Sequence, residues 1–350
     1  FSGFKNSLTS VDFKDIVDTS LVSNFSSLFN GCSKLETING IEKFDTKNVQ
    51  YIDWIFQNCS KLKSLDLSNW TITNKVTTMW GLFDGCSALE TLKLGTFDTS
   101  NVTNMNYVFQ NCSKLTSLDV SGWNVSKVVN FNSTFRGMTS LTSLDLSNWE
   151  TSSATDMFGM FLGDSSLTDL KVSKFDTSNV TDMRFMFQSC GHDSMTNLNL
   201  GNLFDTSNVN NMKGMFWATG YEKMTSLNLG SKFNTSNVTD MNSMFNKTGY
   251  ISMTSLDLGQ AFTKIADNNE YMFYNTGKSG AVIYATESIY KNRTSFKLSN
   301  TDTSTAAGTI AVPSRRTVNP IYRPEWTVTA TAMVDMTSEV EKRGINIRLK

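Results

Sequence analysis

Residues 97–120 read FDTSNVTNMNYVFQNCSKLTSLDV, and this stretch decides the fold because it recurs along most of the chain. Its phenylalanine, Phe109, has an equivalent every 26 to 29 residues, and the leucine pattern Leu115-x-x-Leu118-x-Val120 begins six residues later. The equivalent phenylalanines are Phe29, Phe56, Phe83, Phe109, Phe135, Phe161, Phe187, Phe216, Phe245 and Phe273. One copy is too short to bury its own apolar side chains, whereas stacked copies share a continuous core. The sequence therefore predicts a solenoid.

Each copy is expected to hold one short strand and one turn. Leu65-Asp66-Leu67 alternates apolar and polar residues, and equivalent strands of successive coils run the same way and pair in parallel. Residues 98–101, Asp-Thr-Ser-Asn, have turn chemistry because these side chains hydrogen-bond the nearby backbone. The spacing across residues 183–187 predicts a short helical or 3₁₀ turn. We expect an α/β solenoid of about ten coils with a stacked parallel β-sheet, roughly 45–50 Å long.

The coils become longer from Phe187 onward, where the 26-residue repeat gives way to repeats of 28 or 29 residues. Most of the additional length falls in one turn. Residues 112–115, Cys-Ser-Lys-Leu, correspond to residues 190–195, Cys-Gly-His-Asp-Ser-Met, and similar turns recur at 219–224 and 248–253. Because the insertions are confined to one corner, coils 7 to 10 are expected to form a distinct sub-array with an enlarged loop edge.

The composition argues against several classes of function. The chain of 350 residues has 31 Lys and Arg against 32 Asp and Glu, and it lacks the basic runs that neutralise nucleic-acid phosphates. No stretch approaches the 18 consecutive apolar residues of a membrane span. His192 is the single histidine, whereas most hydrolytic and metal chemistries use this residue. We therefore expect no enzyme, no cofactor, no nucleic-acid partner and no membrane span.

The recurring pattern resembles that of a known family. Phe-Asp-Thr-Ser-Asn-Val-Thr-x-Met-x-x-Met-Phe-x-x-Cys-x-x-Leu-x-x-Leu-x-Leu is similar to the repeat of the BspA-like leucine-rich-repeat surface proteins, in the branch of surface lipoproteins from wall-less bacteria. Residues 98–120 and 176–189 match it closely, within a resemblance that covers about 20–300. The resemblance implies a right-handed leucine-rich-repeat solenoid on a bacterial surface, with adhesion as its role. Coils 5 and 6 depart from the pattern by lacking the cysteine, and the turn at 71–73 is one residue longer.

The two ends of the chain depart from the repeat. Residues 1–20 carry scattered apolar side chains and are expected to cap the first coil of a solenoid that spans 21–297. Residues 298–320 are rich in Ser, Thr, Asn, Ala and Gly, a composition typical of a linker. Residues 321–350 contain two alternating segments around a turn, which predicts a β-hairpin at the start of a truncated β-sandwich domain.

The cysteines share one position of the repeat, three residues after its phenylalanine. They are Cys32, Cys59, Cys86, Cys112 and Cys190. One thiol per coil does not give the converging pairs of a metal site. Their number is odd, and threonine takes the same position at Thr219 and Thr248, so we interpret them as small buried thiols. A disulfide between adjacent coils remains an alternative on spacing alone.

Two polar clusters are candidate catalytic sites. His192 precedes Asp193 in one of the longer turns, but a catalytic pair also needs a nucleophile from a second segment, and none stands out from the repeat. Asp119 and Asp145 take outward strand positions of neighbouring coils, as paired carboxylates of glycosidases could. Lysines such as Lys93 interrupt that row, so we interpret it as a polar sheet face that is open to a partner.

Aromatic residues at positions that the repeat does not fix are the candidate binding residues. Trp54, Trp80 and Tyr107 lie on three consecutive coils, just before the repeat phenylalanine. Exposed aromatic side chains are enriched at binding hot spots, so these three form the favoured patch. The alternative is that such side chains fold over the next coil and are buried. Phe158 and Phe185 take the same positions in other coils, and Trp217 and Tyr274 directly follow the repeat phenylalanine.

These features favour a secreted, non-catalytic bacterial surface adhesin that binds an extracellular protein, such as a host receptor or a matrix protein, rather than a glycan. The alternative is a passive cell-surface spacer that holds another binding domain away from the cell. An enzyme is a third hypothesis, which the single histidine and the uniform repeats disfavour. Because the chain begins at Phe1 and not at methionine, the signal and anchor are expected outside this sequence.

Overall fold

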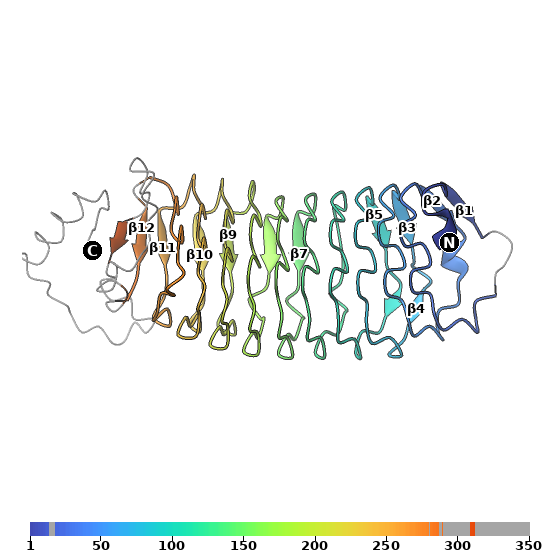
Figure 1. The fold of residues 1–350 in the computed structure, drawn as a ribbon, viewed down its shortest axis with the longest axis horizontal. Helices are drawn as coiled ribbons and strands as arrows, with labels where there is room; N and C mark the ends of the chain where they lie inside the picture. The colour runs from blue at the N-terminus through green and yellow to red at the C-terminus, as the bar shows by residue number, and fades with distance from the viewer. Residues whose placement is uncertain (14–17, 280, 287–288, 290–308, 312–350) are drawn as a thin grey trace, which may run out of the picture.

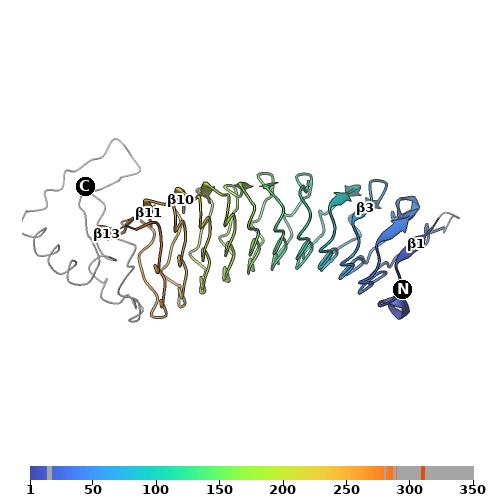
Figure 2. The same cartoon turned by 90° about the horizontal axis from the view of Figure 1, so that it is seen from above.

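The computed structural model describes residues 1–13, 18–279, 281–286, 289 and 309–311. These residues form one long rod of stacked coils, with the N-terminal coil at one end and the longer coils at the other (Figure 1). Seen from above, the rod is gently curved and successive coils lie side by side along its length (Figure 2). The repeat therefore folds as the predicted solenoid.

Short parallel strands from successive coils form one side of the rod. Within the repeats the strands are β2 (Thr37–Asn39), β3 (Ser64–Asp66), β5 (Thr91–Lys93), β7 (Ser143–Asp145), β8 (Asp169–Lys171), β9 (Asn197–Asn199), β10 (Ser226–Asn228), β11 (Ser255–Asp257) and β12 (Val282–Tyr284). The pairs β3–β5, β7–β8, β9–β10 and β11–β12 are all parallel and in register. A second, shorter pair joins β4 (Thr71–Ile72) to β6 (Thr96–Phe97).

The core is a column of stacked phenylalanines, one from each coil. Successive ring centroids from Phe29 to Phe273 lie 5.3 to 5.8 Å apart, and the rings are within 11° of parallel. Each of these rings is buried. Each ring covers the face of the next, so the apolar surface that one coil exposes is buried by its neighbour. This column explains why the phenylalanine is the least variable residue of the repeat.

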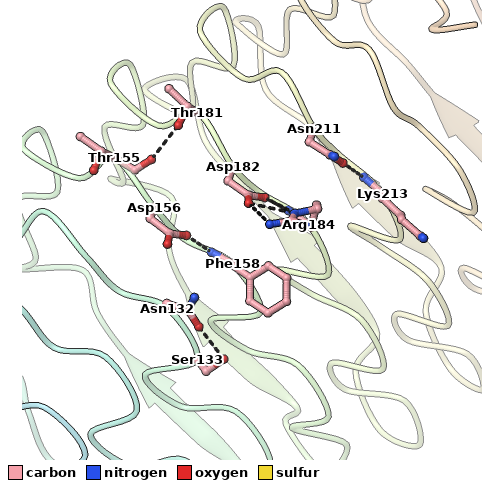
Figure 3. A network of polar contacts seen from close by, with 10 residues as sticks. All are labelled: Asn132, Ser133, Thr155, Asp156, Phe158, Thr181, Asp182, Arg184, Asn211 and Lys213. Atoms are coloured by element: carbon pink, nitrogen blue, oxygen red, sulfur yellow. Dashed lines mark hydrogen bonds and ion pairs between the residues drawn. The ribbon is translucent and has the colours of Figure 1, made fainter. Parts of the chain in front are cut away.

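A second parallel ladder runs along the edge of the coils as single bridges. It joins Asn24 to Tyr51 and then links Thr78, Asn104, Asn130, Asp156, Asp182, Asn211, Asp240 and Asn268 in succession. In most coils the ladder side chain accepts the backbone N–H two residues later, as Asn104 does from Asn106 at 2.9 Å. Figure 3 shows the same turn at Asp156, Asp182 and Asn211. The polar residue before the methionine is therefore a turn residue.

The turn expected at residues 183–187 is present, because the Met186 N–H donates to the Met183 carbonyl at 3.3 Å, but it is not helical. The N–H groups of Phe185 and Phe187 donate to the carbonyls of Lys213 and Met215 in the next coil, at 2.9 Å each, and not to their own turn. Phe185 has a φ of 59°, in the left-handed region that interrupts a helix. The helical elements with described bounds are two 3₁₀ turns, η1 (Ser2–Phe4) and η2 (Ile41–Lys43). The solenoid is confirmed, but its coils are built from strands and turns.

Strands also occur near both ends of the chain. β1 (Ser10–Asp12) lies within the stretch expected to cap the solenoid and pairs with β2. β13 (Thr309–Ala311) lies within the stretch 298–320, expected to be a linker, and pairs in register with β12. Its short Thr-Ile-Ala segment continues the sheet by one further strand. The hairpin predicted for 321–350 lies outside the described residues.

Candidate binding surface

The candidate aromatic residues lie beside the edge ladder, at a backbone position that has an unusual conformation. In every coil, the residue two before the repeat phenylalanine has a φ between 53° and 60°. We call this position the left-handed row. Its members are Ser27, Trp54, Gly81, Tyr107, Ser133, Gly159, Phe185, Gly214, Ser243 and Tyr271. Glycine adopts this conformation without strain, whereas a bulky side chain there is an outlier.

Trp54 folds over the following coil and meets Trp80. The two indole centroids are 5.0 Å apart and their planes meet at 51°. A Cβ added to Gly81 would lie 2.8 Å from Cδ1 of Trp54, so the tryptophan occupies the space that a side chain at Gly81 would need. Phe185 covers Gly214 in the same way. Two of the large aromatic residues in the left-handed row, Trp54 and Phe185, are thus each paired with a glycine in the next coil.

Asp53 holds the backbone of Trp80 in place. In most other coils an Asn or Asp of the edge ladder accepts the backbone N–H two residues later. Here the ladder residue is Thr78, and the Trp80 N–H donates instead to Asp53 of the preceding coil. Its carboxylate accepts the Trp80 N–H at 2.8 Å and the Thr78 hydroxyl at 3.0 Å. Burial raises the pKa of the half-buried Asp53 carboxyl, while both hydrogen bonds act in the opposite direction.

The structure brings two of the three predicted residues into contact. Trp54 and Trp80 form the indole pair, whereas Tyr107 lies in the left-handed row of the next coil, with its N–H bonded to the Asn132 carbonyl at 3.0 Å. Trp80 is 38% exposed, and Trp54 and Tyr107 are half-buried. Trp54 therefore folds over the next coil, as the alternative held, and still keeps part of its ring accessible.

The other aromatic residues form a second cluster, an edge-to-face pair of Tyr271 with Tyr274 at 6.0 Å between centroids, and the separate Trp217. Phe158 and Phe185 meet edge to face with centroids 5.8 Å apart. The Arg184 guanidinium lies 5.0 Å from the Phe158 ring centroid, and Figure 3 shows these two side chains. Trp217 is 37% exposed. Tyr271 is 41% exposed, and sequence reasoning missed it although it takes the same repeat position as Trp54. Counting back two residues from Phe273 would have found it.

The cysteine position is a small, buried hydrogen-bond donor. All five cysteines are free and buried, as interpreted from their spacing. Cys59 Sγ lies 3.3 Å from the Phe29 carbonyl oxygen of the preceding coil, and Thr219 Oγ1 lies 2.6 Å from the Phe187 carbonyl oxygen. Burial raises the pKa of the Cys59 thiol, which keeps it protonated and able to donate. This shared bond explains why cysteine and threonine replace one another.

His192 belongs to a stack of rings on the longer turns. It contacts Asp193, and its ring lies parallel to that of Tyr221 with centroids 4.8 Å apart. Tyr221 in turn stacks on Tyr250 at 5.1 Å. Among the described residues, no three His, Cys, Asp or Glu side chains are grouped so that they could hold a metal ion. The insertions therefore build an aromatic ladder along one loop edge.

The outward carboxylates of the sheet face are matched with lysines of the next coil. Asp66 binds Lys93 and Asp145 binds Lys171, each at 2.9 Å. A hydrogen bond from Ser147 and the ion pair with Lys171 lower the pKa of the Asp145 carboxyl. Asp119 instead accepts the N–H and the hydroxyl of Ser121. The ion pairs join neighbouring coils, as expected of a polar sheet face.

Solved structures with related architecture have low sequence identity to this chain. A complex of TLR13 with ssRNA13 is 15% identical over 82% of this chain and 48% of its own, with a TM-score of 0.30. The Toll–Spätzle complex from Drosophila is 15% identical over 84% and 41%, with a TM-score of 0.27. A leucine-rich repeat protein from Bacteroides ovatus is 14% identical over 86% and 83%, with a TM-score of 0.27. The chain thus spans less than half of the first two.

The fold is a solenoid of stacked coils joined by short parallel strands and single parallel bridges. No curated protein matches the chain. Within the described residues, no helix is long and apolar enough to cross a membrane. One family profile matches four overlapping stretches, residues 2–92, 77–199, 130–223 and 192–305, which together cover most of the sequence. The chain therefore belongs to the family described as Mycoplasma protein of unknown function, DUF285.

Proposed function

We propose that this protein is a non-catalytic adhesin of a bacterial cell surface and that it binds an extracellular protein through Trp54, Trp80 and Tyr107. One observation carries the proposal. Trp54 and Tyr107 hold left-handed backbone positions that six of the ten coils give to glycine or serine, and both keep part of their rings accessible. Large aromatic side chains held in a strained backbone at a surface are typical of binding sites.

The energetics of folding account for these side chains only in part. A residue other than glycine in the left-handed conformation loses about 1–2 kcal/mol. Trp54 offsets this through its contacts with Trp80 and with the backbone at Gly81. Tyr107 faces Ser133, not glycine, in the next coil and has no ring partner among the described residues. A function at the surface explains why a tyrosine occupies this position.

The shape of the patch favours a protein partner over a glycan. The two indole planes meet at 51°, so they do not form the flat platform on which a sugar ring stacks. Tryptophan and tyrosine are among the residues most enriched at protein–protein contacts. The long face of a solenoid also offers a partner several coils at once.

The location at a bacterial surface rests on the repeat and on the family. The Phe-Asp-Thr-Ser-Asn-Val-Thr pattern resembles that of the BspA-like surface proteins, and the family is described from Mycoplasma. A wall-less cell exposes its surface proteins directly to its host or to neighbouring cells. A host receptor or a matrix protein is therefore the class of partner that we propose.

The test is a binding screen of the 350-residue chain against extracellular-matrix proteins, mucosal proteins, ectodomains of immune receptors and a glycan array. The variant W54S/W80S/Y107S is screened in parallel. The matched control is F158S/F185S/Y271S, which removes aromatic residues from the same two repeat positions in other coils. Circular dichroism checks that both variants keep the wild-type spectrum.

The proposal is supported if a protein binds the wild-type chain saturably, does not bind W54S/W80S/Y107S and still binds the control variant. A screen in which no protein binds the chain contradicts it and favours the passive spacer. Binding to glycans alone contradicts the proposed class of partner. Equal loss in both variants contradicts the placement of the site on coils 2 to 4.

A further inference from the structure

A second surface feature lies in the strand side of the rod, between β5 and residues 116–120 of the next coil. It is a cleft of about 490 Å³, which we call the sheet cleft. The apolar side chains that line it are Leu92, Leu94, Phe97, Leu118 and Trp123. Its size is within the range of ordinary ligand pockets.

A local shift in register accounts for the cleft. β5 pairs with β3 so that Ser64 lies opposite Thr91, but β6 pairs with β4 so that Thr71 lies opposite Thr96. The chain thus advances seven residues from Ser64 to Thr71 in coil 2, but only five residues from Thr91 to Thr96 in coil 3. Coil 3 crosses the gap directly through Gly95, where a Cβ would clash with the carbonyl oxygens of the preceding coil. The turn at 71–73, which is one residue longer than in other coils, lies next to this shift in register.

Apolar side chains next to the shift in register lie partly outside the core. Leu92, Leu94 and Leu118 are partly exposed. The equivalent residues of most other coils are buried, namely Leu65, Leu67, Leu144, Leu146, Leu170, Val172, Leu198, Leu200, Leu227, Leu229, Leu256 and Leu258, whereas Ile38 in the first coil is also partly exposed. In coils 2 to 10, partly exposed leucines at this repeat position therefore lie at the sheet cleft and are not a general property of the sheet face.

The walls of the sheet cleft also carry unpaired backbone groups. Thr91 donates to Lys63, and Leu67 donates to Lys93, so residues 91 and 93 face β3. By the alternation of a strand, the N–H and C=O of Leu92 point into the cleft. In the described chain no backbone hydrogen bond joins β5 to residues 116–120.

Other breaks in the sheet do not produce a cleft. β8 and β9 are also not paired with each other, but their central leucines, Leu170 and Leu198, stay buried. The coil containing residues 116–120 differs because it is unpaired and lies beside exposed apolar side chains. The combination of partly exposed leucines with free strand edges is what points to a ligand.

We propose that the sheet cleft binds an extended peptide segment, which places one large apolar side chain between Leu92 and Leu118 and pairs its backbone with Leu92. A peptide is favoured over an apolar small molecule because only a chain with alternating N–H and C=O groups can satisfy the strand edges. Lys93 at the rim is already paired with Asp66, whereas Asp119 bonds only within its own turn. The rim is therefore anionic, and a Lys or Arg next to the apolar anchor complements it.

This site shares no residue with the Trp54, Trp80 and Tyr107 patch and does not depend on the proposed adhesin function. Hydrogen exchange of the free 350-residue chain tests the cleft before any ligand is known. The Leu92 N–H is expected to exchange at least 100-fold faster than the Lys93 N–H, which faces β3 in the same strand. Equal protection of the two amides would overturn the proposal, because the cleft would then be closed.

The ligand is tested with a display library of nonapeptides, selected on the whole chain and measured by fluorescence anisotropy. We expect enriched peptides with one large apolar residue beside a Lys or Arg. L118K and N-methylation of the backbone next to the apolar anchor should each weaken binding at least 10-fold. L203K, the matched control at an exposed leucine outside the cleft, should leave binding unchanged.

Binding should also survive in W54S/W80S/Y107S, which separates this site from the adhesin patch. Three results would overturn the proposal: no enriched peptide, full binding by the N-methylated peptides, or full binding by L118K. Binding of the dye 1-anilinonaphthalene-8-sulfonate in the cleft without any peptide would likewise assign it to small apolar molecules.

Discussion

The packing of Trp54 on Gly81 makes a prediction that a double-mutant cycle can test. Gly81 has a φ of 60°, and a Cβ there would lie 2.8 Å from Trp54 Cδ1. G81A should therefore introduce two separate effects, backbone strain and a clash. Gly159 is the matched control, because it has a φ of 56° but its nearest neighbour to an added Cβ is the Ser133 hydroxyl at 3.5 Å, an ordinary contact.

The backbone strain should be similar at the two positions, whereas the clash should occur only in G81A. Backbone strain should lower the free energy of unfolding by about 1–2 kcal/mol in both G81A and G159A. In G81A the tryptophan must also move, which forfeits its contact with Trp80 and part of its burial, a further loss of about 1–3 kcal/mol. In the W54S background the clash is absent, so G81A should lose only the strain. The expected coupling between positions 54 and 81 is thus about 1–3 kcal/mol.

The assay is urea denaturation of wild type, W54S, G81A, W54S/G81A and G159A, followed by circular dichroism. Each curve gives a midpoint and a slope, and a constant slope across the set shows that stability alone has changed. Equal losses in G81A and G159A would refute the packing of Trp54 on Gly81. So would a loss in G81A that W54S does not reduce.

Three further outcomes follow from buried groups of the coils. Burial raises the pKa of Asp164 well above its usual range, so its folded form binds a proton more tightly and stability falls as pH rises above about 4. D164N should therefore be more stable than wild type at pH 7 and equal to it at pH 3, as measured by thermal unfolding. D53A removes two hydrogen bonds that position Trp80, and it should lower the free energy of unfolding by about 1–3 kcal/mol and redden the tryptophan emission. C112T should change urea stability by less than about 1 kcal/mol because threonine donates the same bond in other coils, whereas C112A should lose about 1 kcal/mol.

The period of the sequence was enough to predict the solenoid and its core. The recurring phenylalanine fixes which side chain of each coil enters the column, and stacking then follows from the need to bury it. The spacing also predicted the free, buried cysteines, because their position tolerates threonine. These features depend on which residues recur, and a single chain with ten copies displays that directly.

The conformation of the turns could not be predicted from spacing alone. The i, i+3, i+4 pattern at residues 183–187 is also compatible with turns whose N–H groups bond to the next coil, and the choice depends on pairing between coils. Glycine and serine in the left-handed row were a signal of positive φ, but Trp54 and Tyr107 in the same row obscured it. The sheet cleft depends on a shift in register between coils 2 and 3. The one-residue insertion at 71–73 is visible in the sequence, but it does not specify how the strands of the two coils pair.

The most direct test of the adhesin site is the affinity of the protein partner for two variants that differ only in the coils they change. We predict that W54S/W80S/Y107S raises the dissociation constant by at least about 30-fold, which corresponds to the loss of about 2 kcal/mol or more of binding free energy at a hot spot. F158S/F185S/Y271S should bind like wild type. An unchanged dissociation constant for W54S/W80S/Y107S would contradict the assignment of this surface as the binding site.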